Sequence, residues 1–436
     1  MPLQKLQFRP GINRETTSYS NEGGWFDMDK VRFRFGYPEK IGGWIKSSTT
    51  TFLGTCRALH PWVALDGTNY LGVGTHLKYY INEGGGYNDI TPIRTTTSAG
   101  EVTFSASDNE LDGAISAIDT TITLTSSSGF PTSGRIKIDS EIITYASLSS
   151  NNLIGCVRGV NDTVAATHAD EADVLCATLV VSDSNHGALE NDFVTFSGAA
   201  TLGGVIAADI LNQEYQITSI INDNSYQVEA RTVSTIGSIT TTTGLNPTYV
   251  FATSADSGNG GGSIVGTYQI NTGLDTTIVG NGWGAGTWSR GAWGSGTSLS
   301  ASGQTLRIWS HDNFGEDLLM NVRDGDIFYW DRTNGTSTRA VELASIAGAN
   351  KVPIVAKQIM VSDRDRHVIA FGCDSELNPG VQDPLLIRFS DQENILEWQS
   401  LVDNTAGDLR IGSGSKIITA LETRQQVLVF TDTSLH

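Results

Sequence analysis

The chain has 436 residues and a formal net charge of −19. One hydrophobic core usually stops growing at about 250 to 300 residues, so this length predicts several domains. No apolar run approaches the roughly 18 residues of a membrane span, and the N-terminus Met1-Pro-Leu-Gln-Lys-Leu-Gln-Phe lacks the apolar core of a signal peptide. We therefore expect a soluble chain that is not exported by the general route.

The acidic residues are concentrated in the middle of the chain. Residues 95–265 carry 4 Lys and Arg against 19 Asp and Glu, whereas residues 1–94 carry 11 against 8. An acidic surface repels nucleic acid, so this region is not expected to grip DNA, and a solvated surface is the simplest interpretation. The four cysteines, Cys56, Cys156, Cys176 and Cys373, show neither a disulfide framework nor zinc-ligand spacing.

A basic strand is predicted near the N-terminus, where basic and apolar residues alternate with the period of a half-buried strand. The basic residues are Lys30, Arg32 and Arg34, and the apolar ones are Val31, Phe33 and Phe35. We expect the turn Gly36-Tyr-Pro-Glu to end this strand. Its basic face is either a solvated surface or a contact with another subunit or with the DNA backbone.

The sequence around this strand resembles a known family. The N-terminal region is similar to the N-terminus of the tail hub or nozzle proteins of short-tailed bacteriophages (podoviruses), the family that resembles tail tubular protein B. The residues that carry the resemblance are Gly11-Ile-Asn, Gly23-Gly-Trp and Arg32-Phe-Arg-Phe-Gly-Tyr-Pro-Glu-Lys-Ile-Gly-Gly-Trp. The resemblance covers residues 1–94 and, through strand pattern alone, 300–436. It implies an arm that leads into propeller blades, and a ring, usually of six subunits, that closes the distal end of the tail tube until DNA is ejected.

A short hairpin unit recurs along the chain, with an apolar strand, a tight turn and a second apolar strand. Its copies lie at 70–81, 317–330, 367–372 with 385–389, and 427–434. Asp324-Gly325 between two apolar runs is a strong hairpin signal. The C-terminal copies are roughly 50 to 60 residues apart, close to the spacing of propeller blades. The sequence therefore predicts an all-β protein, a β-propeller with two small inserted β modules.

The insertion begins where composition changes to Ser, Thr, Asp and Ala. We expect an N-terminal arm with the first propeller strands at 1–94, β module 1 at 95–178, β module 2 at 179–262, and the continuing propeller at 263–436. Module 2 has expected strands at 179–182, 193–197, 215–221 and 226–230. Both modules resemble small β modules of phage structural proteins, and as insertions at a loop tip they would project outward.

A Gly-rich stretch after the modules holds Trp283, Trp288 and Trp293, five residues apart, together with Arg290. Glycine-rich sequence of this kind does not form a core of its own. Aromatic side chains serve as interface anchors and also stack on sugars, so the stretch is our candidate subunit or partner interface. The alternative is packing against its own subunit, whereas similar Trp-Gly loops in the phage hub family favour a contact between subunits.

The last strand stops before its hairpin is complete. We therefore expect the C-terminus to lie beside an incomplete sheet, and the chain to be the N-terminal portion of a longer one or to receive a strand from elsewhere.

No set of catalytic, cofactor-binding or metal-binding residues emerges. His168 is followed by Asp170, Glu171 and Asp173 but has no second histidine at ligand spacing. Nucleophile elbows, phosphate-binding loops and His-Glu-x-x-His motifs are absent from the sequence. We expect no cofactor and no enzyme, although the carboxylate pair of a propeller glycosidase could come from distant positions.

The sequence thus predicts a structural subunit of a phage tail hub or nozzle ring, which forms the distal DNA channel, retains the packaged genome and permits its ejection. It would be assembled in the host cytoplasm and reside in the virion. Expected partners are further copies in a hexameric ring, other tail proteins (adaptor, fibre or needle) and, transiently, packaged double-stranded DNA. The alternative is a receptor-binding tail module that recognises host-surface glycans.

Overall fold

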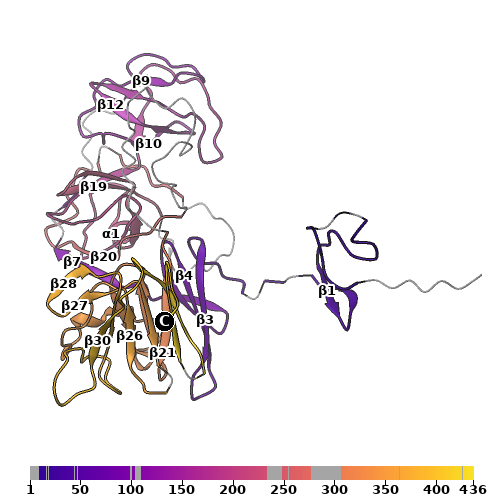
Figure 1. Cartoon of the computed structure of the whole chain (residues 1–436). Helices are drawn as coiled ribbons and strands as arrows, with labels where there is room; N and C mark the ends of the chain where they lie inside the picture. Colours follow the sequence, from indigo (N-terminus) through magenta and orange to yellow (C-terminus); the bar gives the residue numbers. More distant parts are fainter. Residues whose placement is uncertain are drawn as a thin grey trace, which may run out of the picture. The chain divides into compact units, whose positions relative to one another are not determined.

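The computed structural model describes residues 9–15, 17, 19–43, 45–46, 48–98, 101–103, 110–232, 248–253, 255–275, 306–362, 364–424 and 426–436. The chain forms two compact units, Met1–Thr49 and Thr50–His436, and strands make up nearly all of the regular secondary structure in the described residues of both (Figure 1). Among the described residues, no helix is long and apolar enough to cross a membrane.

The N-terminal unit contains a hairpin of β1 (Val31–Arg34) and β2 (Tyr37–Lys40), paired along their full length. Its two turn residues are Phe35 (φ 50°) and Gly36 (φ 85°). Positive φ at both central positions is typical of a two-residue hairpin turn. The basic strand is confirmed, but two details of the prediction are wrong. Phe35 lies in the turn with 89% of its surface exposed, and Tyr37 opens a second strand instead of continuing a turn.

The second unit contains four antiparallel sheets that follow one another along the chain, here called body sheets 1 to 4. Body sheet 1 consists of β3 (Cys56–Val63), β4 (Asn69–Thr75), β5 (Tyr79–Glu83) and β6 (Gly86–Asp89). Body sheet 2 consists of β21 (Trp309–Phe314), β22 (Asp317–Val322), β23 (Ile327–Trp330) and β24 (Val341–Glu342), with the 3-10 turns η1 (Arg332–Asn334) and η2 (Leu343–Ser345). Body sheet 3 consists of β25 (Gln358–Val361), β26 (Val368–Phe371), β29 (Leu386–Phe389) and β30 (Gly407–Arg410), with the side hairpin β27 (Asp374–Ser375) and β28 (Asn378–Gln382). Body sheet 4 consists of β31 (Ile417–Glu422) and β32 (Val427–Thr431).

The body sheets pack face to face. In β22, Leu318 and Met320 belong to the core shared with body sheet 1, whereas Leu319 belongs to the core shared with body sheet 3. In β25, Ile359 faces body sheet 2 and Met360 joins the core shared with body sheet 4. Successive side chains of a strand point to opposite faces, so body sheets 2 and 3 are buried on both faces. The four sheets therefore stack in chain order.

The first strands of successive body sheets are neighbours: β3 contacts β21, β21 contacts β25, and β25 contacts β31. Between the first two sheets, the Trp309 indole N–H donates to the Thr75 carbonyl at 2.7 Å. The indole lies so close to Gly74 that a Cβ there would be 2.5 Å from Trp309 Cδ1, which requires glycine. The all-β class and the recurrent hairpins are confirmed. The described sheets do not close into a ring or barrel, so the propeller remains a prediction.

Body sheet 4 has two strands where the other three body sheets have four. Its last residues turn back onto β32, because Val429 and His436 exchange two backbone hydrogen bonds of 2.9 Å and Phe430 bridges to Leu435. The residues around His436 thus lie beside a two-stranded sheet, and the expected truncation of the last hairpin remains a prediction.

Module 1 consists of two three-stranded sheets. One contains β9 (Thr121–Thr123), β12 (Ser147–Ser149) and β13 (Asn152–Ile154), and the other contains β10 (Gly134–Ile138), β11 (Glu141–Tyr145) and β14 (Val174–Cys176). The expected β structure of this region is confirmed. All four cysteines are free, and of these only Cys56 is exposed.

Module 2 consists of two four-stranded sheets and a short helix, α1 (Ala208–Leu211). One sheet contains β8 (Glu101–Thr103), β15 (Thr178–Ser182), β18 (Ser219–Asn222) and β19 (Ser225–Glu229). The other contains β7 (Ile93–Ser98), β16 (Phe193–Ser197), β17 (Glu214–Gln216) and β20 (Val265–Gln269). The single strand expected at 215–221 is wrong, since this stretch is divided between the two sheets.

Strand pairing groups the residues differently from the expected domain ranges. β7 and β8 lie at the start of the range expected for module 1, yet they pair with β20 and β15 of module 2. Module 1 is therefore inserted between strands of module 2. One core, whose buried members run from Leu111 to Tyr268, is shared by the two modules.

Candidate functional site

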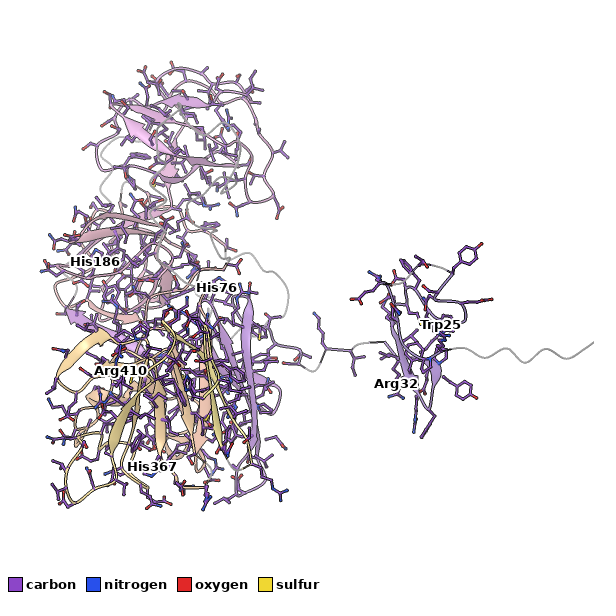
Figure 2. All side chains as sticks on the ribbon, in the orientation of Figure 1. Trp25, Arg32, His76, His186, His367 and Arg410 are labelled. Atoms are coloured by element: carbon purple, nitrogen blue, oxygen red, sulfur yellow. The ribbon has the colours of Figure 1, made fainter. Side chains whose placement is uncertain are left out.

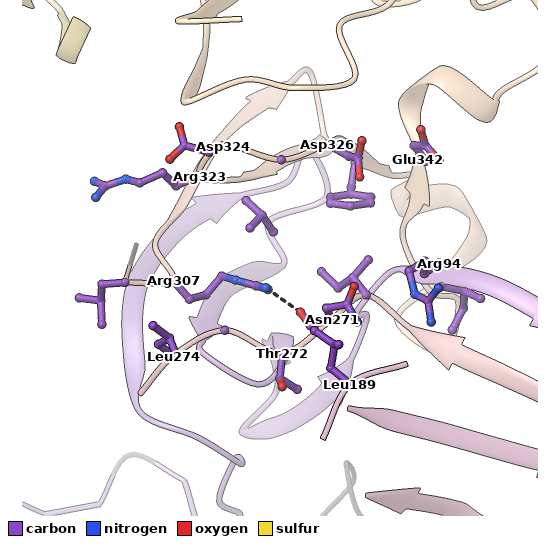
Figure 3. A pocket seen from close by; sticks show the side chains of 17 residues that line it. Arg94, Leu189, Asn271, Thr272, Leu274, Arg307, Arg323, Asp324, Asp326 and Glu342 are labelled. Atoms are coloured by element: carbon purple, nitrogen blue, oxygen red, sulfur yellow. Dashed lines mark hydrogen bonds between the residues drawn. The ribbon is translucent and has the colours of Figure 1, made fainter. Parts of the chain in front are cut away.

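A cleft of about 430 Å³ lies between module 2 and body sheet 2 (Figure 3). Module 2 contributes β7 and the chain that leaves β20, residues 270–274. Body sheet 2 contributes Arg307, the turn between β22 and β23, and Glu342 of β24. Clefts of this size at junctions between substructures are common places for small ligands.

Three arginines line the cleft, Arg94, Arg307 and Arg323, and backbone carbonyls hold the first two. Arg307 points toward Asn271 and donates to its carbonyl at 2.6 Å (Figure 3). Burial lowers the pKa of Arg307 to about 10, although the nearby Asp192 carboxylate opposes this shift. Arg94 donates to the His186 carbonyl at 3.0 Å. Within the described part of the chain, neither guanidinium forms an ion pair with a carboxylate.

The carboxyl groups of the cleft come from body sheet 2. Burial, and secondly the charge of Glu342, raise the pKa of Asp326 to about 6. Asp324, in the same turn, accepts a hydrogen bond from Gln382 Nε2 at 2.9 Å. The cleft therefore combines arginines from both substructures with carboxyl groups from body sheet 2, which is a binding arrangement for a small polar ligand.

No motif in the sequence predicted this cleft. The hairpin turn predicted at Asp324-Gly325 is the turn between β22 and β23, and this turn also carries the Asp326 carboxyl group into the cleft. Arg94 and Arg307 belong to no motif and are brought together only by the fold.

The predicted basic face is partly neutralised. Arg32 and Arg34 are exposed residues of β1, and Arg32 pairs with Glu39 of β2 at 3.0 Å (Figure 2). Lys30 precedes the strand with φ 56° and lies 3.7 Å from Asp29. The structure thus places Arg32 and Arg34 on the same strand face and leaves Lys30 outside the strand.

The predicted aromatic interface, Trp283, Trp288, Arg290 and Trp293, lies outside the described residues. On either side of it, Leu274 and Leu306 form a parallel bridge, and both line the cleft. The role of the stretch as an interface remains a prediction.

A buried charge network joins module 2 to the body. Lys78, in the turn between β4 and β5, is 0% exposed, and its Nζ lies 2.6 Å from Asp89 and 2.7 Å from Glu214 of β17. Arg339 reaches the same carboxylates at 2.9 and 3.5 Å. Burial raises the pKa of Glu214, whereas Lys78 and Arg339 outweigh burial at Asp89 and lower its pKa. This network serves to hold two substructures together.

His168, the histidine with acidic neighbours in sequence, is also part of a buried network. Its Nδ1 lies 2.8 Å from Asp139 and its Nε2 lies 2.8 Å from Glu141. Arg158 donates to both oxygens of Glu141, at 2.8 and 2.7 Å. Both ring nitrogens of His168 are thus engaged by carboxylates, and the described residues contain no cluster of three or more His, Cys, Asp or Glu that could hold a metal ion.

No family model and no curated protein matches the chain. Among solved structures, the phage phi92 endosialidase matches with 11% identity and a TM-score of 0.17, over 87% of this chain and 51% of that one. The chain thus spans about half the length of that protein. A TM-score this low carries no argument about fold or activity.

Proposed function

We propose that this chain is a structural subunit of the tail of a short-tailed bacteriophage, in the hub or nozzle ring that forms the distal DNA channel. The observation that carries the proposal is the order of parts. An N-terminal unit with the phrase that begins at Arg32 precedes a stack of antiparallel sheets, as the family resemblance implies. The subunit would retain the packaged genome and permit its ejection, and it would reside in the virion after assembly in the host cytoplasm.

The stacked body sheets support a β-propeller as the finer fold. In a propeller, each four-stranded blade lies between two others around a central channel. Body sheets 2 and 3 have both faces buried against neighbouring sheets, and the first strands β3, β21, β25 and β31 contact one another in sequence. We propose that these sheets are consecutive blades and that their first strands line the channel.

Both ends of the stack carry exposed apolar side chains, which supports assembly. On β3, Leu59 is 58% and Val63 is 64% exposed, and on β31, Leu421 is 54% exposed. Exposed apolar groups that cluster on one face mark contact surfaces. We propose that these faces, with the Trp283 to Trp293 stretch, contact further copies in a hexameric ring and other tail proteins such as an adaptor, fibre or needle.

Contact with packaged DNA would be transient and electrostatic. Arg32 and Arg34 are exposed, but Glu39 compensates Arg32, so a weak and strongly salt-dependent contact is proposed. No catalytic step is part of the proposal, and turnover of a polysaccharide by the purified chain would contradict it.

The test is the native mass of the purified chain together with class-averaged electron microscopy. A six-fold ring with a central channel is the expected result. Leu421→Asp should dissociate the ring, whereas Ile118→Asp, at a module 1 residue that is 84% exposed, should leave it intact. A particle that stays monomeric over the micromolar range, or an oligomer without a channel, would contradict the proposal.

A further inference from the structure

The guanidinium groups of Arg94 and Arg307, in the cleft between module 2 and body sheet 2, use only part of their hydrogen-bonding capacity within the described residues. A guanidinium carries five N–H donors. Arg307 donates a hydrogen bond to the Asn271 carbonyl, and Arg94 donates one to the His186 carbonyl. No carboxylate of the described residues forms an ion pair with either arginine. Elsewhere in the same unit, partly buried arginines such as Arg158 and Arg332 do form such pairs. The cleft thus presents positive groups ready for an anion.

The carboxyl groups across the cleft favour a ligand that also donates hydrogen bonds. Asp326 and Glu342 line the cleft from body sheet 2 (Figure 3). An ionised carboxylate only accepts hydrogen bonds, so its natural partners in a small ligand are hydroxyl groups. Ile270 and Phe328 add apolar lining, which is suited to the C–H face of a sugar ring.

We propose that this cleft binds an acidic saccharide, with its carboxylate against Arg307 and Arg94 and its hydroxyl groups donating to Asp326 and Glu342. The site uses none of the β3 and β31 residues proposed for assembly, whereas Leu274 and Leu306, which flank the Trp283 to Trp293 stretch in the sequence, line it. The volume of about 430 Å³ falls within the range of small-molecule sites.

A nucleic-acid phosphate fits the same cleft less well. The carboxylates of Asp326 and Glu342 would repel a highly charged phosphate backbone, whereas a sugar carries one negative charge and several hydroxyl donors. The combination of guanidinium and carboxylate groups therefore selects the sugar acid over a phosphate.

The test is isothermal titration calorimetry of the full chain at pH 7 and low salt with three probes: D-glucuronate, D-glucose and inorganic phosphate. Glucuronate should bind with a dissociation constant of about 1 to 10 mM, and glucose and phosphate at least about tenfold more weakly. Arg307→Gln should weaken glucuronate binding by about tenfold or more, because a charge-assisted bond is lost. Arg94→Gln provides a second test if Arg307→Gln impairs folding, which thermal unfolding would show.

The matched control is Arg410→Gln. Arg410 lies outside the cleft with its side chain 60% exposed and pairs with Asp383 (Figure 2). This variant has the same change in charge and should bind glucuronate like the unaltered protein. The proposal is overturned if glucuronate shows no saturable binding up to about 50 mM, if glucose or phosphate binds equally well, or if the folded cleft variants bind like Arg410→Gln.

Discussion

Replacing Lys78 by Met tests whether the buried charge network fixes module 2 to the body. The Lys78 side chain is fully buried, with its Nζ 2.6 Å from Asp89 and 2.7 Å from Glu214. Methionine keeps the length and the packing against Phe193 but removes the charge. Two buried carboxylates are then left with Arg339, which is 28% exposed and reaches Glu214 only at 3.5 Å.

Removing one partner of a buried ion pair costs about 3 to 5 kcal/mol, because the remaining charge has lost its compensation. For the unit Thr50–His436, we expect the unfolding temperature to fall by about 4 to 6 °C. Hydrogen exchange should quicken in β5 and β17, whose chain segments the network joins. The loss should shrink toward pH 5, since burial raises the pKa of Glu214 and a proton can then neutralise this carboxyl group.

A double-mutant cycle separates this effect from lost packing. Lys78→Met combined with Glu214→Gln should cost less than the sum of the two single changes, by about 1 to 3 kcal/mol. The control is Arg410→Gln, which breaks an exposed pair and should cost at most about 1 kcal/mol. Additive single effects, or a loss in Lys78→Met no larger than in the control, would refute the reasoning.

Three further variants test other parts of the molecule by thermal unfolding. Glu141→Gln should destabilise module 1 by about 3 to 5 kcal/mol at pH 7, because Arg158 and His168 lose their buried carboxylate. Hydrogen bonds outweigh burial and lower the pKa of Glu141 to about 2, so its contribution is present above the unfolded pKa and should disappear as pH falls from 4.5 toward 2. Asp326→Asn should stabilise the chain at pH 7 by about 1 to 2 kcal/mol, a range that allows for solvent screening, because the raised pKa makes the ionised carboxylate costly above about pH 6. This gain in stability should vanish near pH 4, and an unchanged pH profile would contradict the prediction. Gly74→Ala should cost about 1 to 3 kcal/mol through its clash with Trp309, and a neutral effect would contradict the close packing described.

Local patterns predicted the strands well. Alternation around Lys30 to Phe35 located β1, and Asp324-Gly325 located the turn between β22 and β23, because side-chain period and turn chemistry are properties of short segments. The same patterns predicted the end of β1 wrongly, because they placed Phe35 in the strand. Phe35 fits the alternation, but two residues with positive φ are needed for the turn, and Phe35 is one of them.

Strand partners were less predictable, because they depend on contacts between distant segments. The expected boundary between the first propeller strands and module 1, at 94/95, falls inside β7, which instead pairs with β20, beyond both modules. The same limit applies to the cleft. Arg94 and Arg307 are isolated in the sequence, and only the pairing of β7 with β20 and the packing of body sheet 2 bring them to one place.

The separation of the cores leads to a last prediction, that residues 93–270 fold on their own. Every buried member of the core of modules 1 and 2 lies between Leu111 and Tyr268, and the cores of the body sheets are distinct from it. The strands that close module 2, β7 and β20, pair with each other, so excision leaves the sheets of both modules intact.

Calorimetry of the full chain should therefore show two unfolding transitions, and the excised segment should reproduce one of them. Glu214→Gln distinguishes the two contexts. In the full chain it removes a partner of Lys78 and is destabilising, whereas in the segment Lys78 and Arg339 are absent and a neutral amide should be tolerated or preferred. A segment without a cooperative transition, beside a full chain that melts in one step, would mean that the body is required to fold the modules. The charge network would then lie within a single cooperative folding unit instead of connecting two units that fold independently.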